Sequence, residues 1–533
     1  MRKSIITPLL LASALNLMAQ GTSLFSRPSL AQTKLSYVFT AIEKLYVDSV
    51  DQDNLVETGI VAMLKELDPH SSYIPAEELA RTNEPLEGSF DGIGIQFQIL
   101  EDTLYVIQTI SGCPAEKVGV RAGDRMIMIN DSLVAGVKVQ NSDIMKKLRG
   151  KRGTTVKVSM KRQGVPQLID FKIERDKIPI YSIDAAYMID KLTGYVKINN
   201  FGATTLDEFH TALAGLKAQN MQQLILDLQG NGGGYLMAAI DLADQFLDKD
   251  KMTVYTEGLK QRRSAALSTP KGDFEENRLV ILVDEYSASA SEIVSGAVQD
   301  WDRGVLVGRR TFGKGLVQRQ LMLPDNSAMR LTTARYYTPS GRCIQKPYKG
   351  IDYHKDLETR FEHGEFMHAD SIQFPDSLKY ETLVNKRTVY GGGGIMPDIF
   401  VPIDTTQFTD YHRKIVAFGV VNNSCLNYLN DHREELEQKY PTFEKFEKKF
   451  KIDTQLLEAL KANATKEKIE FNATQFEISR NLICQQLKAL IARDIWSMTE
   501  YFKIMNMHDD VVLKALEIIN NKTTYEQILE GNK

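Results

Sequence analysis

Short apolar segments alternate with helical patterns between residues 176 and 404, and this alternation limits most strongly how the chain can fold. Strand and helix patterns that alternate in this way predict an α/β layered core. Several expected strands run directly into glycine or serine turns, and α/β sheets tend to hold ligands at such strand ends. The expected strands are 194–198, 223–227, 279–283, 305–308 and 329–333, and the expected helices are 205–216, 235–246 and 289–300.

The regions on either side of this core carry other patterns. Apolar residues at helical spacing in 33–84 predict an N-terminal helical segment, with a helix that ends near Asp68-Pro69. Glycine turns between short strand patterns in 85–175 predict a small β-rich module. Residues 405–533 predict amphipathic helices for core packing or self-association. Inside the core region, the polar stretch at about 346–386 is interpreted as an insertion.

Length and charge limit the classes of function. A chain of 533 residues exceeds what one hydrophobic core supports and predicts three or four units. Its formal net charge is −4, whereas proteins that mainly bind nucleic acid present a basic surface. A nucleic-acid partner is therefore not expected, and a peptide partner is compatible with this charge.

The first residues predict export from the cytoplasm. Arg2 and Lys3 precede an apolar run from Ile5 to Ala19, which is long enough for a signal peptide and short for a membrane span. A signal peptide is therefore expected at 1–19, with cleavage after Ala19 or Ala31 left open. A retained N-terminal anchor is the alternative.

Residues 284–292, with the sequence DEYSASASE, carry the densest chemical signal. An apolar strand pattern runs into small residues, and a helix pattern begins directly after them. A nucleophile here would lie at a helix N-terminus, where backbone N–H groups can stabilise a developing oxyanion. A serine-rich cap before an ordinary helix is the structural alternative.

A lysine at a second strand end offers a general base for this serine. Lys314 stands between Gly313 and Gly315, and a third strand end carries the glycine-rich turn DLQGNGGG at 227–234. A serine, a lysine and the N–H groups of such a turn would form an acyl-transfer site. A lysine in water has a pKa near 10.4, and burial lowers it by up to about 3–5 units, so a desolvated Lys314 can act as a base. Gln318 follows closely, after one helical or short loop step, and could hold the lysine by a hydrogen bond.

Two other patterns resemble a metal site and a phosphate-binding loop, but each lacks a feature that such a site requires. The histidines of the polar stretch have no metal-ligand spacing, so no metal site is expected at His354, His363 or His368. Gly308, Gly313 and Lys314 match the beginning of a phosphate loop, but a glycine follows where such a loop needs serine or threonine for Mg²⁺. A nucleotide-binding enzyme is therefore not favoured.

Isolated histidine and cysteine residues are interpreted as structural. His70 lies in an expected loop, where packing or capping is the usual role of a single histidine. The cysteines show no paired zinc-site spacing and are interpreted as small buried hydrophobic residues. They are Cys113, Cys343, Cys425 and Cys484.

The serine run and the Gly-Lys-Gly motif together resemble the C-terminal processing peptidases, also called tail-specific proteases, over about residues 34–404. The resemblance implies that Ser289 is the nucleophile and Lys314 its base. It also implies that Gln318 supports this dyad, and that the backbone amides of Gly233 and Ala290 form the oxyanion hole.

The same family carries a PDZ domain ahead of its protease core, and residues 85–175 resemble that domain. The sequence FDGIGI at 90–95 resembles its carboxylate-binding loop, which implies that Ile93, Gly94 and Ile95 bind the substrate. Successive N–H groups of a glycine-rich turn can capture a terminal carboxylate, and the next strand can pair with an extended tail. The sequence LDPHS at 67–71 matches a further family motif that is interpreted as structural.

The chain departs from the family pattern in three places. The family usually has Asn-Pro-Gly-Gly in the oxyanion turn, whereas Gly232 follows Asn231 here. Gln229 stands where the family has arginine. The polar insertion and the C-terminal helical region also exceed the simplest family pattern.

These patterns together predict a multidomain α/β protein with a crotonase-like, Clp-protease-like core, a β-rich PDZ domain and helical N- and C-terminal regions. The expected function is a serine endopeptidase that recognises the free C-terminal tail of protein substrates and cuts near that end. A non-catalytic PDZ scaffold is the alternative, although it would not need a lysine beside a serine. No cofactor is expected. The expected partners are protein or peptide tails, with an adaptor, an activator and self-association left open, and the resemblance implies the bacterial periplasm or cell envelope.

Overall fold

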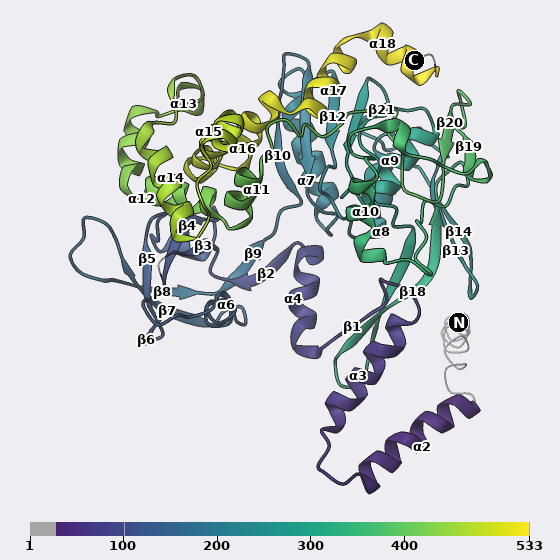
Figure 1. Ribbon diagram of the computed structural model, residues 1–533, viewed down its shortest axis with the longest axis horizontal. Helices are drawn as coiled ribbons and strands as arrows, with labels where there is room; N and C mark the ends of the chain where they lie inside the picture. The colour runs from purple at the N-terminus through teal and green to yellow at the C-terminus, as the bar shows by residue number, and fades with distance from the viewer. Residues whose placement is uncertain (1–27, 101, 532–533) are drawn as a thin grey trace, which may run out of the picture. The chain divides into compact units, whose positions relative to one another are not determined.

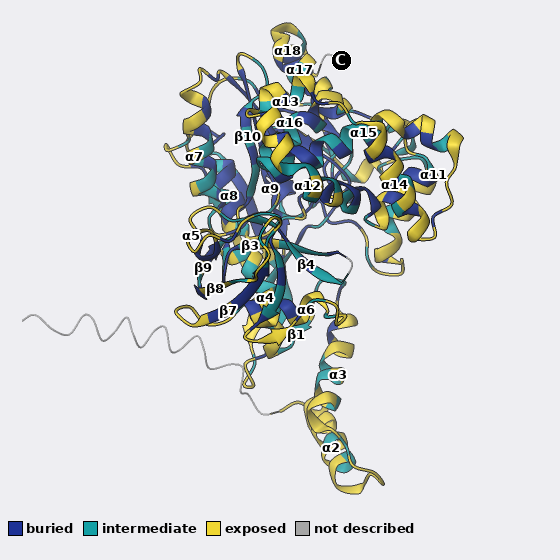
Figure 2. Ribbon diagram, turned by 90° about the vertical axis from the view of Figure 1, so that its left-hand side faces the viewer, coloured by how far each residue is buried: buried dark blue, intermediate teal, exposed yellow. Residues whose placement is uncertain are grey.

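The computed structural model describes residues 28–100 and 102–531, and the chain divides into two compact units, Met1–Tyr73 and Ile74–Lys533. The first unit contains helices α2 (Leu30–Leu45) and α3 (Gln52–Lys65). Figure 2 shows both helices mostly exposed, and Leu64 is the one residue in them that is buried. The predicted signal peptide at 1–19 lies outside the described residues.

A turn at Asp68 follows α3. The Asp68 carboxylate accepts hydrogen bonds from the N–H groups of His70 (2.8 Å) and Ser71 (2.9 Å), so this aspartate closes its own turn. The helix ends at Lys65, slightly before the predicted end, and strand β1 (Ser72–Ile74) lies inside the segment that was predicted to be helical. Helix α4 (Ala76–Glu87) opens the second unit.

A β-rich domain follows α4. Its main sheet has the strand order β3-β4-β5-β7-β8, with β6 paired to β5, while β2 and β9 form a separate antiparallel pair. The β-rich module that was predicted for this region is confirmed. The elements are β2 (Ser89–Gly92), β3 (Ile95–Leu100), β4 (Thr103–Thr109), α5 (Pro114–Lys117), β5 (Arg125–Ile129), β6 (Ser132–Leu133), α6 (Asn141–Leu148), β7 (Thr155–Lys161), β8 (Ile169–Glu174) and β9 (Asp176–Pro179).

The α/β core is built on a sheet of order β10-β11-β12-β15-β16-β21. Strands β10 and β11 pair antiparallel, and the remaining neighbours pair parallel. Strand β15 consists only of buried leucine, valine and isoleucine residues, as expected for a parallel strand covered on both faces. The strands are β10 (Ile183–Met188), β11 (Thr193–Ile198), β12 (Gln223–Asp227), β15 (Leu279–Val283), β16 (Val305–Gly308) and β21 (Ile399–Phe400).

Two helical layers cover this sheet, and alternate residues of each strand face different layers. Leu224 and Leu226 pack with α7 (Thr205–Lys217), α8 (Leu236–Asp244) and α9 (Ala290–Asp300). Ile225 packs on the other face, with α17 (Asp510–Asn520) and α18 (Lys522–Leu529). The period-two alternation of strand side chains thus gives one sheet two cores.

A second sheet lies beside the first. Strand β13 (Met252–Gly258) pairs with β14 (Gln261–Leu267) and with β18 (Ala328–Tyr337), and β18 also pairs with β17 (Leu316–Met322). Strand β18 is longer than the predicted 329–333, because its C-terminal residues continue the pairing with β13.

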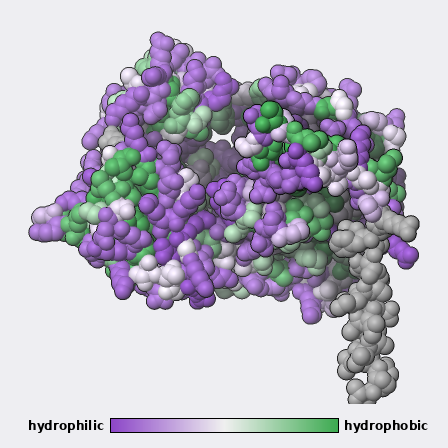
Figure 3. All heavy atoms as spheres, turned by 90° about the horizontal axis from the view of Figure 1, so that it is seen from below, coloured by the Kyte–Doolittle hydropathy of each residue, from purple (hydrophilic) through white to green (hydrophobic). Residues whose placement is uncertain are grey.

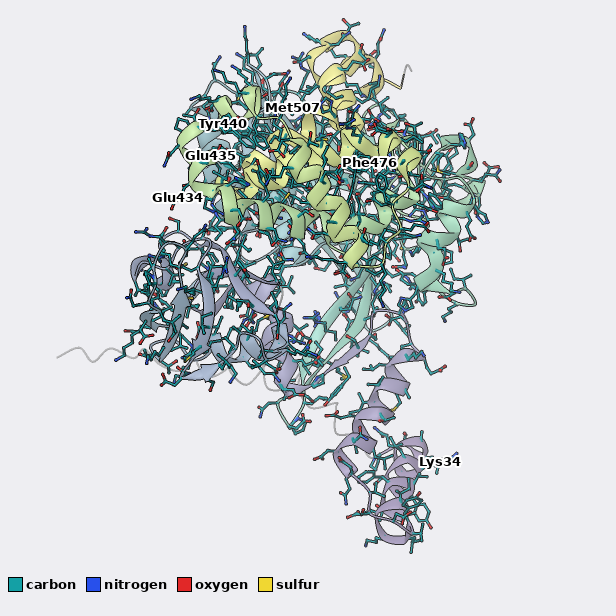
Figure 4. All side chains as sticks on the ribbon, turned by 60° about the vertical axis from the view of Figure 1, so that its left-hand side comes forward. Lys34, Glu434, Glu435, Tyr440, Phe476 and Met507 are labelled. Atoms are coloured by element: carbon teal, nitrogen blue, oxygen red, sulfur yellow. The ribbon has the colours of Figure 1, made fainter. Side chains whose placement is uncertain are left out.

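The C-terminal region is helical, as predicted. Helices α11 to α16 share a core of their own, which includes Tyr440 and Phe476, both labelled in Figure 4. None of the helices in the described part of the chain is long and apolar enough to cross a membrane. The helices are α11 (Asp410–Ala417), α12 (Val420–Lys439), α13 (Phe443–Lys449), α14 (Thr454–Lys466), α15 (Ala473–Ile495) and α16 (Met498–Met505).

Helix α12 also contacts the β-rich domain. The side chain of Gln98 in β3 exchanges hydrogen bonds with Asn422 (2.6 Å) and Asn423 (2.5 Å), and Arg125 donates to Asn430 (3.2 Å). Glu434, labelled in Figure 4, lines a cavity of about 610 Å³ between the two. The predicted α/β class, with a β-rich domain before the core and helical terminal regions, is confirmed (Figure 1).

Candidate active site

Ser289 lies in a strained turn between β15 and α9. Its backbone has φ 55° and ψ −109°, a conformation that costs a non-glycine residue about 1–3 kcal/mol. Asp284 holds the turn, because its Oδ1 atom accepts from the N–H groups of Tyr286 (3.0 Å) and Ser287 (3.0 Å). Ala290 begins α9, so Ser289 stands at a helix N-terminus, as predicted.

Lys314 lies in the loop between β16 and β17, and the glycines on both sides are required by close neighbours. A Cβ atom on Gly315 would lie 2.9 Å from the backbone nitrogen of Gln345. Gly313 has φ 87°, in the region that favours glycine, and a Cβ there would lie 3.0 Å from the backbone nitrogen of Gly394. The loop is therefore packed closely against residues from later in the chain.

Glu292 joins the two turns. Its carboxylate accepts from the backbone N–H of Ser289 (2.8 Å), Lys314 (2.9 Å) and Gly313 (2.7 Å), and from the Thr311 hydroxyl (2.5 Å). The side chain is completely buried, and this burial raises its pKa to about 7 despite the hydrogen bonds, which lower it. A single acid thus fixes the backbone of both predicted reactive residues.

Tyr336 in β18 makes a second link between the same residues. Its hydroxyl donates to the carbonyl of Lys314 at 2.7 Å and lies 3.1 Å from the carbonyl of Ser289. Burial raises the pKa of the Tyr336 phenol well above its usual value, so the hydroxyl keeps its proton.

The glycine-rich turn after β12 packs directly against Ser289. A Cβ on Gly233 would lie 2.8 Å from Ser289 Cβ and 2.8 Å from the carbonyl oxygen of Ala288. The N–H of Gly233 donates to Asn231 Oδ1 at 2.8 Å, and Asn231 Nδ2 donates to the carbonyl of Ile198 at 2.9 Å. The Gly233 N–H is thus hydrogen-bonded to Asn231 in this structure. The role of the Gly233 N–H in binding an oxyanion stays a prediction.

One cavity of about 540 Å³ is lined by every residue predicted for the reaction. Gln318 reaches it from β17, a strand and not the helical or loop step that was expected, and its Nε2 donates to Thr332 Oγ1 at 3.2 Å. Asn83 and Leu86 of α4 and Arg330 of β18 also line the cavity, and no sequence pattern marked them. The predicted residues are Gly233, Ser289, Ala290, Lys314 and Gln318.

A second cavity, of about 370 Å³, lies in the β-rich domain between β3 and α6. Ile93, Gly94 and Ile95 line it, as predicted for a peptide-binding loop, with Met145 and Leu148 of α6 opposite. A Cβ on Gly94 would lie 2.3 Å from Cys113 Cβ, so only glycine fits there. Strand β3 pairs with β4 on one edge, so an extended peptide could pair with its other edge.

The structure argues against the phosphate-loop interpretation. The N–H groups of Gly313 and Lys314, which would have to hold a phosphate, donate to the carboxyl oxygens of Glu292 instead. Within 28–100 and 102–531, no group of three His, Cys, Asp or Glu side chains is arranged to hold a metal ion.

The four cysteines are unpaired, and burial raises the pKa of each thiol. On the face shown in Figure 3, hydrophilic side chains predominate and hydrophobic ones form separate patches. Separate patches of this kind are normal for folded proteins and mark no site by themselves.

Sequence families match three parts of the chain. Peptidase family S41 matches residues 192–356, the PDZ domain matches 92–173, and a family of unknown function matches 411–497. The first match contains the predicted reactive residues Gly233, Ser289, Ala290, Lys314 and Gln318, and the second contains Ile93, Gly94 and Ile95. The third covers most of helices α11 to α15.

Curated relatives are similar over most of their own length. A carboxy-terminal-processing protease of Bartonella bacilliformis is 36% identical over 313 residues, which are 58% of this chain and 71% of the relative. The carboxy-terminal processing protease CtpA of Bacillus subtilis is 34% identical over 347 residues, which are 64% of this chain and 73% of the relative. Among solved structures, a photosystem II D1 C-terminal processing protease is 24% identical, with a TM-score of 0.35 over 72% of this chain and 96% of its own.

Proposed function

Because the chain belongs to the carboxy-terminal processing proteases, the PDZ-containing serine peptidases of family S41, we propose that Ser289 and Lys314 form its catalytic dyad. The observation that carries this proposal is the shared cavity in which Glu292 and Tyr336 hold the backbones of both residues. A serine and a lysine held in this way suit nucleophilic attack with the amine as base.

In the proposed reaction, the neutral Lys314 amine takes the proton of the Ser289 hydroxyl as Oγ attacks the carbonyl carbon of the peptide bond. The tetrahedral intermediate collapses to an acyl-enzyme, and the lysine returns the proton to the leaving amine. Water, deprotonated by the same lysine, then attacks the ester and releases the acid and the Ser289 hydroxyl. Gln318 would assist by holding the Lys314 side chain.

The oxyanion is proposed to bind at the backbone amides of Ala290 and Gly233. The Ala290 amide lies at the N-terminus of α9, where the helix dipole also favours negative charge. The Gly233 N–H already donates to Asn231 Oδ1. It would therefore have to share this hydrogen bond between Asn231 Oδ1 and the oxyanion. Removing one such donor typically lowers kcat about 10²–10³-fold.

The PDZ domain is proposed to hold the free C-terminal tail of a substrate in the cavity between β3 and α6. Binding of a tail in this cavity is also proposed to affect the active site through contacts made by α4. Arg149 lines the tail cavity and pairs with Glu84 at 2.5 Å, while Asn83 accepts from Arg330 at 3.0 Å in the active-site cavity.

Export to the periplasm or cell envelope is part of the proposal, on the basis of Arg2, Lys3 and the apolar run after them. An adaptor, an activator or a second copy of the chain as a partner is compatible with the apolar side chains that α2 and α3 expose. These are Leu30, Leu35, Tyr37, Val38, Leu45, Val56, Val61 and Met63.

The test compares wild type, Ser289→Ala and Lys314→Ala on a loosely folded protein with an apolar, free C-terminus. Cleavage by wild type alone, with loss on amidation of the substrate's terminal carboxylate, is the expected result. Cleavage that persists in Ser289→Ala overturns the nucleophile assignment. Equal cleavage of the amidated substrate overturns tail recognition while leaving the dyad intact.

A further inference from the structure

The polar stretch 346–386 packs against the loop that carries Lys314. It includes η1 (Tyr353–Lys355) and α10 (Asp356–Glu362). Figure 1 shows α10 within the α/β core. Its first residue, Lys346, donates its backbone N–H to the carbonyl of Gly313 at 2.9 Å. The sequence marked this stretch only as an insertion, yet several of its contacts fall on residues 310–313.

Arg360 of α10 makes two of these contacts. It is only 3% exposed, and its guanidinium donates to the carbonyls of Thr311 (3.1 Å) and Arg310 (2.8 Å). Both carbonyls belong to an irregular loop, where no regular ladder supplies their donors. The planar guanidinium suits two acceptors at once, which a lysine ammonium on a flexible stem does not.

An acid shared with a second arginine holds Arg360 in place. Glu365 accepts from Arg360 Nε at 3.2 Å and also pairs with Arg310, whose Nη1 donates to the carbonyl of Gly393 at 2.7 Å. Burial and the neighbouring Arg310 charge lower the pKa of Arg360 to about 10, so the guanidinium stays charged at neutral pH. The shared carboxylate reduces the repulsion between these two guanidinium charges.

Lys346 holds the next residue of the loop. Its ammonium lies 3.5 Å from the centre of the Phe312 ring and 4.4 Å from that of Tyr353, and it donates to Asp356 at 2.7 Å. Phe312 itself donates its backbone N–H to the carbonyl of Ser287, in the turn that carries Ser289. The stretch therefore contacts the loop at every residue from Arg310 to Gly313.

The reaction requires this loop to be positioned accurately. A displacement of about 1 Å in a reacting group can cost about 10²-fold in rate. Gly313 and Gly315 give the loop little stiffness of its own, so its position must come from its surroundings. Glu292 fixes its N–H groups, and the Arg360 guanidinium fixes the carbonyls that precede Lys314.

We propose that Arg360 is a positioning residue that sets the Lys314 loop, so that the amine meets Ser289, and that the stretch 346–386 is a support for the active site. The proposal rests on the proposed function of Lys314 as base. Arg360 itself touches no reacting atom.

The test compares Arg360→Met and Arg360→Lys with Arg303→Met. Arg303 is a matched control, because its guanidinium also donates to backbone carbonyls, those of Phe246 (2.9 Å) and Asn277 (2.9 Å), away from the cavity. The measurements are kcat, KM and the pH profile of kcat for a free-tail peptide, together with Tm and the folded fraction from near-UV circular dichroism.

Arg360→Met is expected to lower kcat per folded enzyme about 10²-fold, with KM changed by less than about 2-fold. Arg360→Lys is expected to give an intermediate loss, since one ammonium cannot reach both carbonyls in the same geometry. The rising limb of the pH profile is expected to move to higher pH, because a less enclosed lysine keeps its proton more strongly. Arg303→Met is expected to lower Tm and leave kcat unchanged.

An unchanged kcat and pH profile in Arg360→Met, or equal losses in Arg303→Met, overturns the proposal. If Arg360→Met does not fold, Arg360→Lys decides, and wild-type kcat in that variant overturns the proposal. These outcomes differ from failure of the proposed function, which would appear as no cleavage by wild type or as cleavage by Ser289→Ala.

Discussion

The backbone N–H groups of Ser289 and Lys314 donate to the same atom, Oε2 of Glu292, at 2.8 and 2.9 Å. The Tyr336 hydroxyl makes the corresponding link on the carbonyl side. Residues from two separate strand ends are thus joined through main-chain atoms before any substrate is present. Preorganisation of this kind avoids rearrangement during the reaction itself.

The buried carboxyl of Glu292 predicts an unusual dependence of stability on pH. Its pKa is about 7 in the folded protein, against 4.5 for an ordinary glutamate carboxyl. Between these values the folded state binds more protons than the unfolded state, so this group's contribution to stability falls as pH rises. We expect the stability of wild type relative to Glu292→Gln to fall by about 3 kcal/mol between about pH 5 and pH 8.

Urea unfolding of both proteins across this pH range is the measurement. A difference in the free energy of unfolding that stays constant with pH would contradict the prediction. Activity should change in the opposite direction, because below about pH 7 a proton on the carboxylate competes with the N–H groups of Ser289 and Lys314. We therefore expect kcat to fall on acidification, while the contribution of Glu292 to the stability of the protein increases.

Neighbouring glycines in the turn after β12 give a matched pair of variants. An alanine at Gly233, where φ is 100°, would place Cβ 2.8 Å from Ser289 Cβ, whereas a Cβ at Gly232 meets nothing within 4 Å. We expect Gly233→Ala to lower kcat by about 10²-fold or more and Gly232→Ala to keep it near wild type. Steady-state cleavage of a free-tail peptide measures both, and equal kcat values would show that the Gly233 position is not critical.

The PDZ loop offers a second glycine pair. Gly94 and Gly112 have similar φ values, 79° and 74°, but only at Gly94 does a Cβ collide, at 2.3 Å from Cys113 Cβ. We expect Gly94→Ala to weaken binding of a fluorescent free-tail peptide by about 10-fold or more, as a distorted loop loses its carboxylate contacts. Gly112→Ala should bind normally. Equal weakening in both variants would point to backbone strain as the cause.

The Glu84–Arg149 ion pair predicts communication between the tail cavity and the active site. We expect Glu84→Gln to bind tail peptides with an affinity within about 2-fold of wild type. We also expect kcat in this variant to no longer depend on an occupied PDZ domain, because the ion pair between α4 and Arg149 is lost. The measurement is cleavage of a tail-less reporter peptide with and without added tail peptide. Glu77→Gln, an exposed change on the same helix, is the control. Normal stimulation in Glu84→Gln would exclude this route.

The sequence predicted the buried strands best. Strands β15 and β16 have the predicted bounds, because continuous apolar runs between glycine and serine turns have few alternative structures. Strand β17 was missed, since Gln318, Arg319 and Gln320 give it a polar pattern. It is a strand because it pairs with β18, and such pairing is not visible in local sequence.

The candidate site was predicted in the same uneven way. Ser289 and Lys314 stand in motifs of small residues that are distinctive in the sequence alone. Glu292 had one available signal, its place three residues after a helix-capping serine. Tyr336 had none, because its link to Lys314 depends on how the second sheet folds over the loop.

The helices α17 and α18 have a consequence for how the chain is made. They cover one face of the central sheet, where Tyr525 bonds both backbone groups of Leu279 at the beginning of β15. A ribosome makes the serine and the lysine more than a hundred residues before it makes these helices. Until then the sheet lacks half of its cover, so a nascent or prematurely ended chain presents an apolar surface to chaperones rather than a finished peptidase. On this reasoning, the core that carries Ser289 and Lys314 is expected to be completed only after α17 and α18 have been made.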